Sequence, residues 1–201
     1  MTLVKTFGCA VYGINATTVT VEVNIDNGIN YHIVGLADSA IRESQQRIDA
    51  ALKNNGPRIP GKKITVNLAP ADIRKEGSAY DLPIAIGILS ASEQMEGAGD
   101  LASCVIMGEL ALDGIIRPVR GALPMAIHAK EAGFSRVILP AENAREAAVV
   151  DGIEVFAMEH LRDVIDLLCG MREFKPIKVD VEKQFLVNGE IADTDFSDVK
   201  G

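Results

Sequence analysis

Apolar and polar residues alternate most regularly in the first third of the chain. The run VTVEVNI places an apolar side chain at every second position, as a strand with one buried face requires. The neighbouring segments are also rich in β-branched and aromatic residues, and Asp26-Asn27-Gly28 is a turn signal. The pattern therefore predicts strands at Val4–Tyr12, Thr17–Ile25 and Tyr31–Val34.

The hydrophobic period changes to that of a helix beyond residue 35. Ile41, Ile48 and Leu52 share one helical face, and Asp38 or Ser39 caps the segment that carries them. This helix is expected to end at Asn55, because Gly56 and Pro57 follow.

The same two periods continue toward the C-terminus. Asp113-Gly114 predicts a hairpin between two adjacent strands. Because helices alternate with strands, the sequence predicts an α/β (α+β) domain built in layers. The remaining predicted helices are Asp81–Met95, Ala122–Ala132, Glu142–Ala148 and Glu159–Cys169, and the remaining strands are Ile64–Leu68, Val105–Leu110, Ile115–Val119, Arg136–Leu139 and Glu154–Ala157.

Composition limits the classes of function. Apolar residues make up 48% of the 201 residues, enough for one good core. The formal net charge of −8 makes this chain by itself a poor binder of nucleic acid, because phosphate contacts require a basic surface. The longest apolar runs are far too short to span a bilayer, and the first residues lack the pattern of a signal peptide. We therefore expect no membrane partner.

Motifs for metals and nucleotides are missing from the sequence. The three histidines have no Cys, His or carboxylate partner at ligand spacing, which argues against a metal site. The three cysteines are widely spaced without a CxxC pair, so we expect a reducing, cytoplasmic setting. The sequence has neither GxxxxGK[ST] nor a GxGxxG that follows a strand. We therefore expect no cofactor in this chain.

The stretch Val66–Ala85 reads as a strand, a charged loop and a helix, a junction that often carries a nucleophile or a phosphate. Asp81 is predicted to be the N-cap of the helix. Its carboxylate would accept hydrogen bonds from backbone N–H groups of the helix, and these keep it ionised. Ser78 is the candidate nucleophile, and Lys75 could act as its base. The competing interpretation is a turn serine in a solvated loop, since three residues of charged loop do not bury a lysine.

Four longer runs resemble a known family. They are VGLADSAIRESQQRIDAALKNNG, ITVNLAPADIRKEGSAYDLPIAIGIL, GELALDGIIRPVRGALPMA and VILPAENAREAA. They are similar to the N-terminal domain of the ComM/YifB group, which are bacterial Mg-chelatase-like AAA+ ATPases, from about residue 3 to residue 170. The resemblance implies the fold of the Lon protease proteolytic domain, which a domain of the fifth ribosomal small-subunit protein shares.

The resemblance also bears on catalysis. Lon-type peptidases use a Ser–Lys dyad, and the resemblance places Asp81 at the position of the serine and Leu123 at that of the lysine. A carboxylate is a poor nucleophile toward an amide, and leucine cannot accept a proton. The resemblance therefore implies that the two dyad positions are degenerate, and that this chain has no catalytic, cofactor-binding or metal-binding residues.

We expect residues 1–172 to form a Lon-like, ChlI-like domain, and residues 173–201 to link it to an AAA+ ATPase module that would bind ATP and Mg²⁺. The leading hypothesis is a non-catalytic accessory domain of a ring-forming AAA+ ATPase. The domain would assist assembly of the ring, regulate the motor or guide its substrate. In this group, ComM-type proteins promote DNA branch migration as ATP-driven motors. The expected partners are the motor module, neighbouring subunits and, through the full-length protein, DNA. The candidate contact residues are Arg74, Lys75, Arg117 and Arg120.

Two alternatives stay open at this point. One is a divergent Lon-like serine peptidase that uses Ser78 as its nucleophile. The other is a magnesium chelatase subunit that acts in porphyrin metallation.

Overall fold

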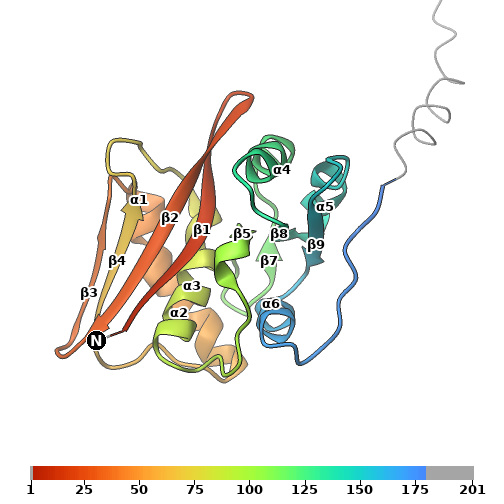
Figure 1. Cartoon of the computed structure of the whole chain (residues 1–201). Coiled ribbons are helices and arrows are strands. Elements are labelled where there is room, and N and C mark those ends of the chain that lie inside the picture. Colours follow the sequence, from red (N-terminus) through yellow and green to blue (C-terminus); the bar gives the residue numbers. More distant parts are fainter. Residues whose placement is uncertain (1, 180–201) are drawn as a thin grey trace, which may run out of the picture.

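Seven strands form one mixed sheet across the molecule (Figure 1). The computed structural model describes residues 2–179. The β1–β2 and β2–β4 pairs are antiparallel, and the other neighbouring pairs are parallel. The predicted layered α/β domain is confirmed. In order across the sheet, the strands are β3 (Asn30–Val34), β4 (Lys63–Ala69), β2 (Asn15–Asp26), β1 (Thr2–Tyr12), β5 (Cys104–Ile106), β8 (Arg136–Pro140) and β9 (Glu154–Met158).

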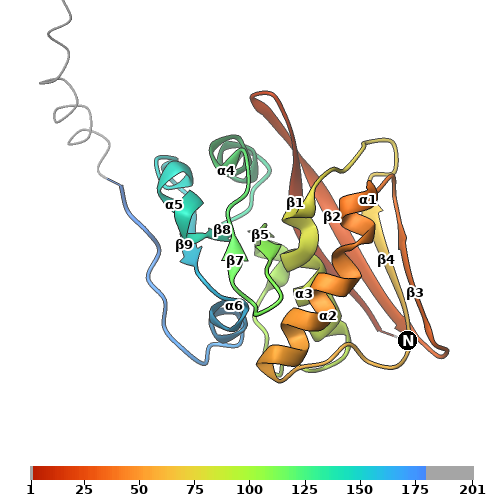
Figure 2. The same ribbon diagram turned by 180° about the vertical axis from the view of Figure 1, so that it is seen from behind.

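Helices pack on this sheet and beside it. Seen from behind, α2 and α3 lie over the half of the sheet that contains β1, β2 and β4 (Figure 2). Two short 3₁₀ helices, η1 (Ser78–Tyr80) and η2 (Leu101–Ser103), precede α3 and β5. The α-helices are α1 (Ser39–Arg42), α2 (Ser44–Asn55), α3 (Asp81–Ala91), α4 (Ala122–Glu131), α5 (Ala141–Ala147) and α6 (Leu161–Leu168).

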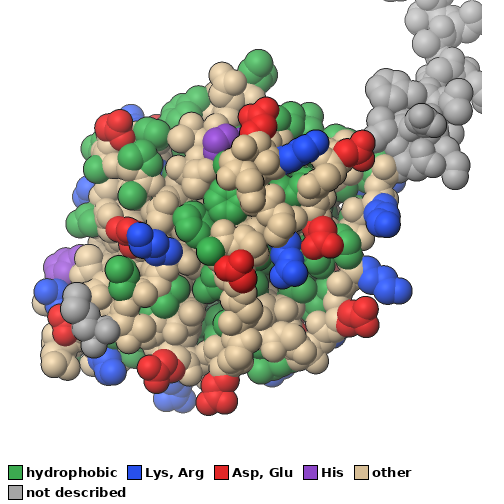
Figure 3. All heavy atoms as spheres, viewed as in Figure 1, with side chains coloured by type: hydrophobic (Ala, Val, Ile, Leu, Met, Phe, Trp, Pro, Cys, Tyr) green, Lys and Arg blue, Asp and Glu red, His purple; other side chains and the backbone are tan. Residues whose placement is uncertain are grey.

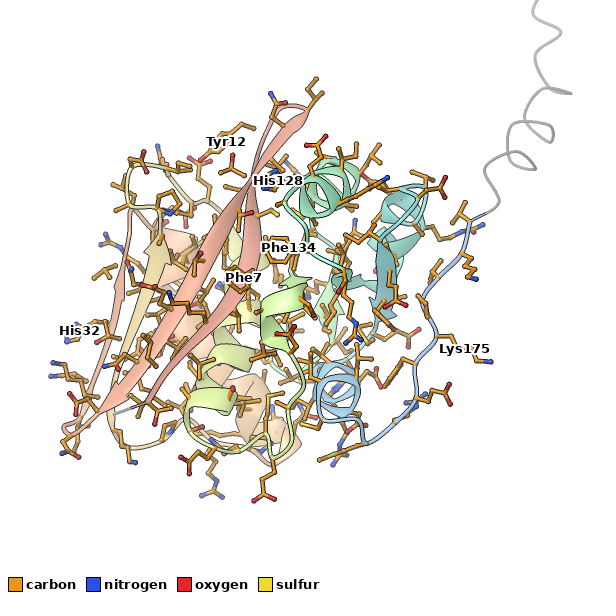
Figure 4. All side chains as sticks on the ribbon, viewed as in Figure 1. Phe7, Tyr12, His32, His128, Phe134 and Lys175 are labelled. Carbon is orange, nitrogen blue, oxygen red and sulfur yellow. The ribbon has the colours of Figure 1, made fainter. Side chains whose placement is uncertain are left out.

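The core lies between the helices and the inner face of the sheet. The apolar residues of the VTVEVNI run are all buried, as the period of two predicts. Helix α3 is buried along nearly its whole length, so it is the central helix of the fold. Near the opposite face, the rings of Phe7 and Phe134 lie 5.3 Å apart, and Nε2 of His128 on α4 lies 2.9 Å from the hydroxyl of Thr18 (Figure 4).

The first predicted helix is interrupted. Asp38 does cap its start, since Oδ1 accepts the N–H of Ile41 at 2.9 Å. The helix then breaks at Glu43, which ends α1 and precedes α2. Helix α3 ends at Ala91 rather than Met95, and Glu93 has a positive φ of 60° that no helix continues through.

The predicted strand Val105–Leu110 is two strands. β5 joins the main sheet, whereas β6 (Glu109–Leu110) pairs with β7 (Ile116–Arg117) in the predicted hairpin. Met107 N–H still donates to Ile138 C=O of β8 at 3.1 Å, and the chain then leaves the sheet as Gly108 N–H donates to Ala79 C=O of η1 at 2.9 Å.

The turn at Asp26–Gly28 leads into β3 as predicted, but β2 and β3 are not neighbours. Strand β4 lies between them and pairs with both. Long-range pairing of this kind leaves no signal in the turn itself.

At the other end of the described chain, Ile177 N–H donates to Val155 C=O of β9 at 2.8 Å. The boundary expected near residue 172 stays a prediction, and most of the expected linker, residues 180–201, lies outside the described residues. Across residues 2–179, the helices are too short or too polar to cross a bilayer.

Candidate functional site

A pocket of about 660 Å³ opens beside the last residues of β1. Its first wall is Cys9–Tyr12 of that strand, and its second is the loop that leads into α3, at Arg74 and from Glu76 to Tyr80. Its third wall is Glu109 together with Pro118–Arg120, which precede α4. The lining is both apolar and charged, a combination that is common in ligand sites.

The loop of the second wall is held at several points. Tyr12 donates its hydroxyl to the carbonyl of Arg74. Asp38 Oδ2 accepts the N–H of Gly77 at 2.9 Å, while Oδ1 of the same carboxylate caps α1. Gly77 has a φ of 84°, a conformation that glycine adopts without strain. The wall is therefore fixed by both β1 and the start of α1.

Ser78, the candidate nucleophile, lines this pocket from η1. Its hydroxyl donates to the carboxylate of Glu109, which also lies 3.5 Å from Nη1 of Arg117. A carboxylate is a weaker base than the lysine or histidine that activates most serine nucleophiles. The Ser78–Glu109 contact fixes the orientation of the hydroxyl at the pocket wall.

Lys75 is fully buried, contrary to the expectation that a charged loop would leave it solvated. Its ammonium group donates to the carbonyls of Gly35, at 3.1 Å, and Pro70. Burial lowers the pKa of this lysine, because desolvation disfavours the charged form. Lys75 does not line the pocket and has no hydrogen bond to Ser78, so the structure does not bring the two residues together as a dyad.

Asp81 is not the N-cap of α3. Tyr80 occupies that position, and Asp81 is the first residue of the helix, with its side chain fully buried. Both carboxylate oxygens accept hydrogen bonds from Arg47, at 2.6 and 2.9 Å, and Oδ2 also accepts the N–H of Leu110 at 3.2 Å. Burial raises the pKa of Asp81 to about 6, although the hydrogen bonds from Arg47 act in the opposite direction.

Arg47 is the residue that the sequence reasoning missed. It lies three residues after Ser44 and four before Ala51, and both are buried on α2. Helical spacing therefore places this arginine on the buried face, and a cation there signals a buried acidic partner.

Leu123 lies in the first turn of α4, half-buried. Its N–H donates to Glu146 Oε1 of α5 at 3.0 Å. Neither Leu123 nor Asp81 lines the pocket. The two positions that the family resemblance assigns to a dyad are thus held by separate contacts within the domain.

The four candidate basic residues have different environments. Arg74 and Arg120 are exposed and line the pocket, and Arg74 pairs with Glu76 at 2.9 Å. Arg117 is exposed beside the pocket and Lys75 is buried. On the face drawn in Figure 3, basic and acidic side chains are interspersed.

Residues 2–179 contain no group of three or more His, Cys, Asp or Glu side chains that could hold a metal ion.

Comparison with known proteins supports the family resemblance that the sequence shows. The family described as subunit ChlI of Mg-chelatase matches residues 21–143. The chain belongs to the Mg-chelatase ChlI family. Within this Mg-chelatase-like group, YifB of Salmonella typhimurium, itself uncharacterized, is 41% identical over 86% of the chain and 34% of its own length. Competence protein ComM of Haemophilus influenzae is 39% identical over 100% of the chain and 39% of its own length.

A more distant relative is Lon protease 2 of Bacillus subtilis, which is 28% identical over 88% of the chain and 35% of that protease. The chain therefore spans between a third and two fifths of the length of these curated relatives.

Proposed function

We propose that this chain is a non-catalytic accessory domain of a Mg-chelatase-like AAA+ ATPase similar to competence protein ComM. The observation that carries the proposal is the placement of the two dyad positions. Asp81 is bound to Arg47 in the core, and Leu123 is an apolar residue outside the pocket. A peptidase dyad requires a nucleophile and a base that meet at the substrate. Asp81 and Leu123 do not provide these groups, and neither side chain lines the pocket.

The proposal extends to the rest of the protein. An ATPase module would bind ATP and Mg²⁺, and it would join this domain and its neighbours in a cytoplasmic ring. Three cysteines among the described residues are free thiols, which is compatible with a reducing compartment. The net charge of −8 favours assembly or regulation over DNA binding by this domain alone.

The first test uses a longer protein that carries both this domain and the ATPase module. Deleting the domain should reduce ring assembly or ATP-driven DNA branch migration. Charge reversal at Arg117 and Arg120 tests whether the basic residues contact DNA. If DNA binding and unwinding stay unchanged in that variant, the domain does not guide DNA through these arginines.

The peptidase alternative is favoured by one observation, the hydrogen bond between Ser78 and Glu109 in a pocket. Casein and short fluorogenic peptides should be cleaved only at background rate by the chain and by Ser78→Ala. Ser135→Ala, at an exposed position directly before β8 and outside the pocket, is the matched control. Cleavage that Ser78→Ala abolishes and Ser135→Ala retains would replace the accessory proposal with a peptidase.

The chelatase alternative predicts that the chain binds a tetrapyrrole. A porphyrin titration followed by absorbance should show no spectral shift when the chain is only an accessory domain. A saturable shift would support a role in porphyrin metallation instead.

A further inference from the structure

Strand β1 has one paired edge and one edge that is open within the pocket. Toward β2 the pairing runs along the whole strand, from Thr2 opposite Ile25 to Tyr12 opposite Asn15. Toward β5 the pairing is confined to Phe7. Beyond that point the free edge of β1 borders the pocket, which the last four residues of the strand line.

The contacts of Cys9 show which residues face this open edge. In an antiparallel pair, successive residues direct their N–H and C=O groups alternately toward the partner and away from it. Cys9 N–H donates to Met107 Sδ at 3.3 Å, and Cys9 C=O accepts the hydroxyl of Tyr80 at 3.0 Å. Both groups therefore point away from β2.

Val11, two residues further along, must direct its N–H and C=O toward the same edge. It is half-buried and lines the pocket. Within residues 2–179, neither of these two groups has a hydrogen-bond partner. A donor and an acceptor of a strand thus face the pocket together.

The edge is open because β5 is short. Met107 N–H still donates to Ile138 C=O of β8, and after Met107 the chain leaves the sheet, where Gly108 N–H donates to Ala79 C=O of η1. No described strand fills the space beside Val11. An unpaired strand edge of this kind is the structure on which extended peptides add as a further strand.

The side chains around this edge suggest what such a peptide would carry. Met107 and Met125 provide an apolar part of the lining. Arg120 is exposed at the pocket, and among the described residues no ion pair joins it, whereas Arg74 pairs with Glu76. An apolar side chain next to an acidic one would match these two features.

We propose that the pocket binds an extended peptide segment of a partner protein, which pairs with Val11 of β1 and places an apolar residue toward Met125 and an acidic residue toward Arg120. This binding is a property of the chain by itself. It therefore stands or falls separately from the accessory role in a motor.

The test uses the 201-residue chain and a fluorescein-labelled peptide, Thr-Val-Leu-Glu-Val-Thr with blocked ends, followed by anisotropy. Val11→Pro removes the N–H that faces the pocket and leaves the β2 ladder intact, so the affinity should fall at least tenfold. Leu3→Pro is the control, because it changes the same edge of β1 outside the pocket and should bind as the unmodified chain does. Far-UV circular dichroism and melting check that both variants fold.

Two further measurements make the outcome independent of the proline variants. In the unmodified chain, addition of the peptide should slow hydrogen exchange at the Val11 amide. Arg120→Glu should weaken binding of the Glu peptide at least tenfold and strengthen binding of its Glu-to-Lys analogue. Equal affinity of Val11→Pro and the unmodified chain would overturn the proposal, as would the lack of saturable binding. Protection of Val11 without peptide would show that the chain or a second copy covers the edge, and would overturn the assignment to a partner.

Discussion

Arg47 and Asp81 form a two-point ion pair that joins α2 to α3. Nε and Nη2 of the arginine donate to the two carboxylate oxygens at 2.6 and 2.9 Å, and the aspartate side chain is 0% exposed. The same carboxylate accepts the N–H of Leu110, next to Glu109 of the pocket. The pair therefore allows a charged residue to stand at the start of a buried helix, and it connects that helix to the pocket wall.

Loss of the arginine should destabilise the domain strongly. Arg47→Met leaves Asp81 buried without its cation, which should lower the free energy of unfolding by about 3–5 kcal/mol. The double variant Arg47→Met/Asp81→Leu should recover most of this loss, because an apolar pair needs no charge compensation. Urea denaturation at pH 7 measures both.

Arg42→Met is the matched control for this prediction, since Arg42 is exposed on the neighbouring α1. Its effect should stay within about 0.5 kcal/mol. If Arg47→Met and Arg42→Met unfold at the same urea concentration, the ion pair contributes nothing to stability.

The raised pKa of Asp81 predicts a pH dependence of stability. Its pKa is about 6 in the folded state, against about 3.9 in an unfolded chain. Between these two values the folded state binds more of this proton than the unfolded state does. The contribution of Asp81 to the free energy of unfolding therefore falls as the pH rises from about 4 to about 6, and it is constant at higher pH.

Asp81→Asn removes this titration and keeps the shape of the side chain. The difference in free energy of unfolding, unmodified chain minus variant, should decrease across that pH interval and then level off. Urea midpoints at intervals between pH 4 and pH 8 provide the measurement. A difference that is independent of pH would mean that Asp81 titrates alike in both states.

Regular periods allowed much of the fold to be predicted from the sequence, whereas the site depends on contacts between distant segments. Alternation identified β2, and helical spacing identified α6, because each reports one buried face. No local pattern encodes the burial of Lys75, which follows from the carbonyls of Gly35 and Pro70. Likewise, the local sequence predicts a cap at Asp81. Its actual partner, Arg47, lies 34 residues away and therefore leaves no signal in that local pattern.

Gly87 is a position where helix and sheet lie unusually close. A Cβ atom there would lie 2.6 Å from Cγ2 of Val23 on β2. Glycine to alanine within a helix normally stabilises by about 1 kcal/mol, but overpacking of this contact should reverse the sign. We expect Gly87→Ala to destabilise by about 1–3 kcal/mol.

A double-variant cycle with Val23→Ala isolates the clash. In the Val23→Ala background, Gly87→Ala should cost little or become stabilising, because the methyl group that it meets is gone. Equal effects of Gly87→Ala in both backgrounds, measured by urea denaturation, would exclude this contact as the cause.

The turn of the β6–β7 hairpin is held from two sides. Asn55 at the end of α2 donates to the carbonyl of Asp113 at 2.8 Å, and Nε2 of His160, which caps α6, lies 3.1 Å from the same oxygen. His160 Nδ1 accepts the N–H of Arg162, so the proton of the neutral ring lies on Nε2 and is donated to the turn. The turn therefore joins α2 to α6, and it supports the strand that carries Glu109.

Gly114 in this turn can be compared with Gly133 after α4. The comparison distinguishes the cost of a packing clash from the cost of backbone strain. Their φ angles are +95° and +87°, so alanine is strained at both. A Cβ at Gly114 would lie 2.4 Å from Nδ2 of Asn55, whereas a Cβ at Gly133 would meet nothing within 4 Å. Gly133→Ala should therefore cost about 1–2 kcal/mol, and Gly114→Ala should cost about 1–3 kcal/mol more. Since Asn55 must move to admit the methyl group, Gly114→Ala should also shift the amide resonances of Glu109 and Ser78, which Gly133→Ala should leave in place. Equal losses of stability in the two variants would show that the contact with Asn55 does not hold the turn.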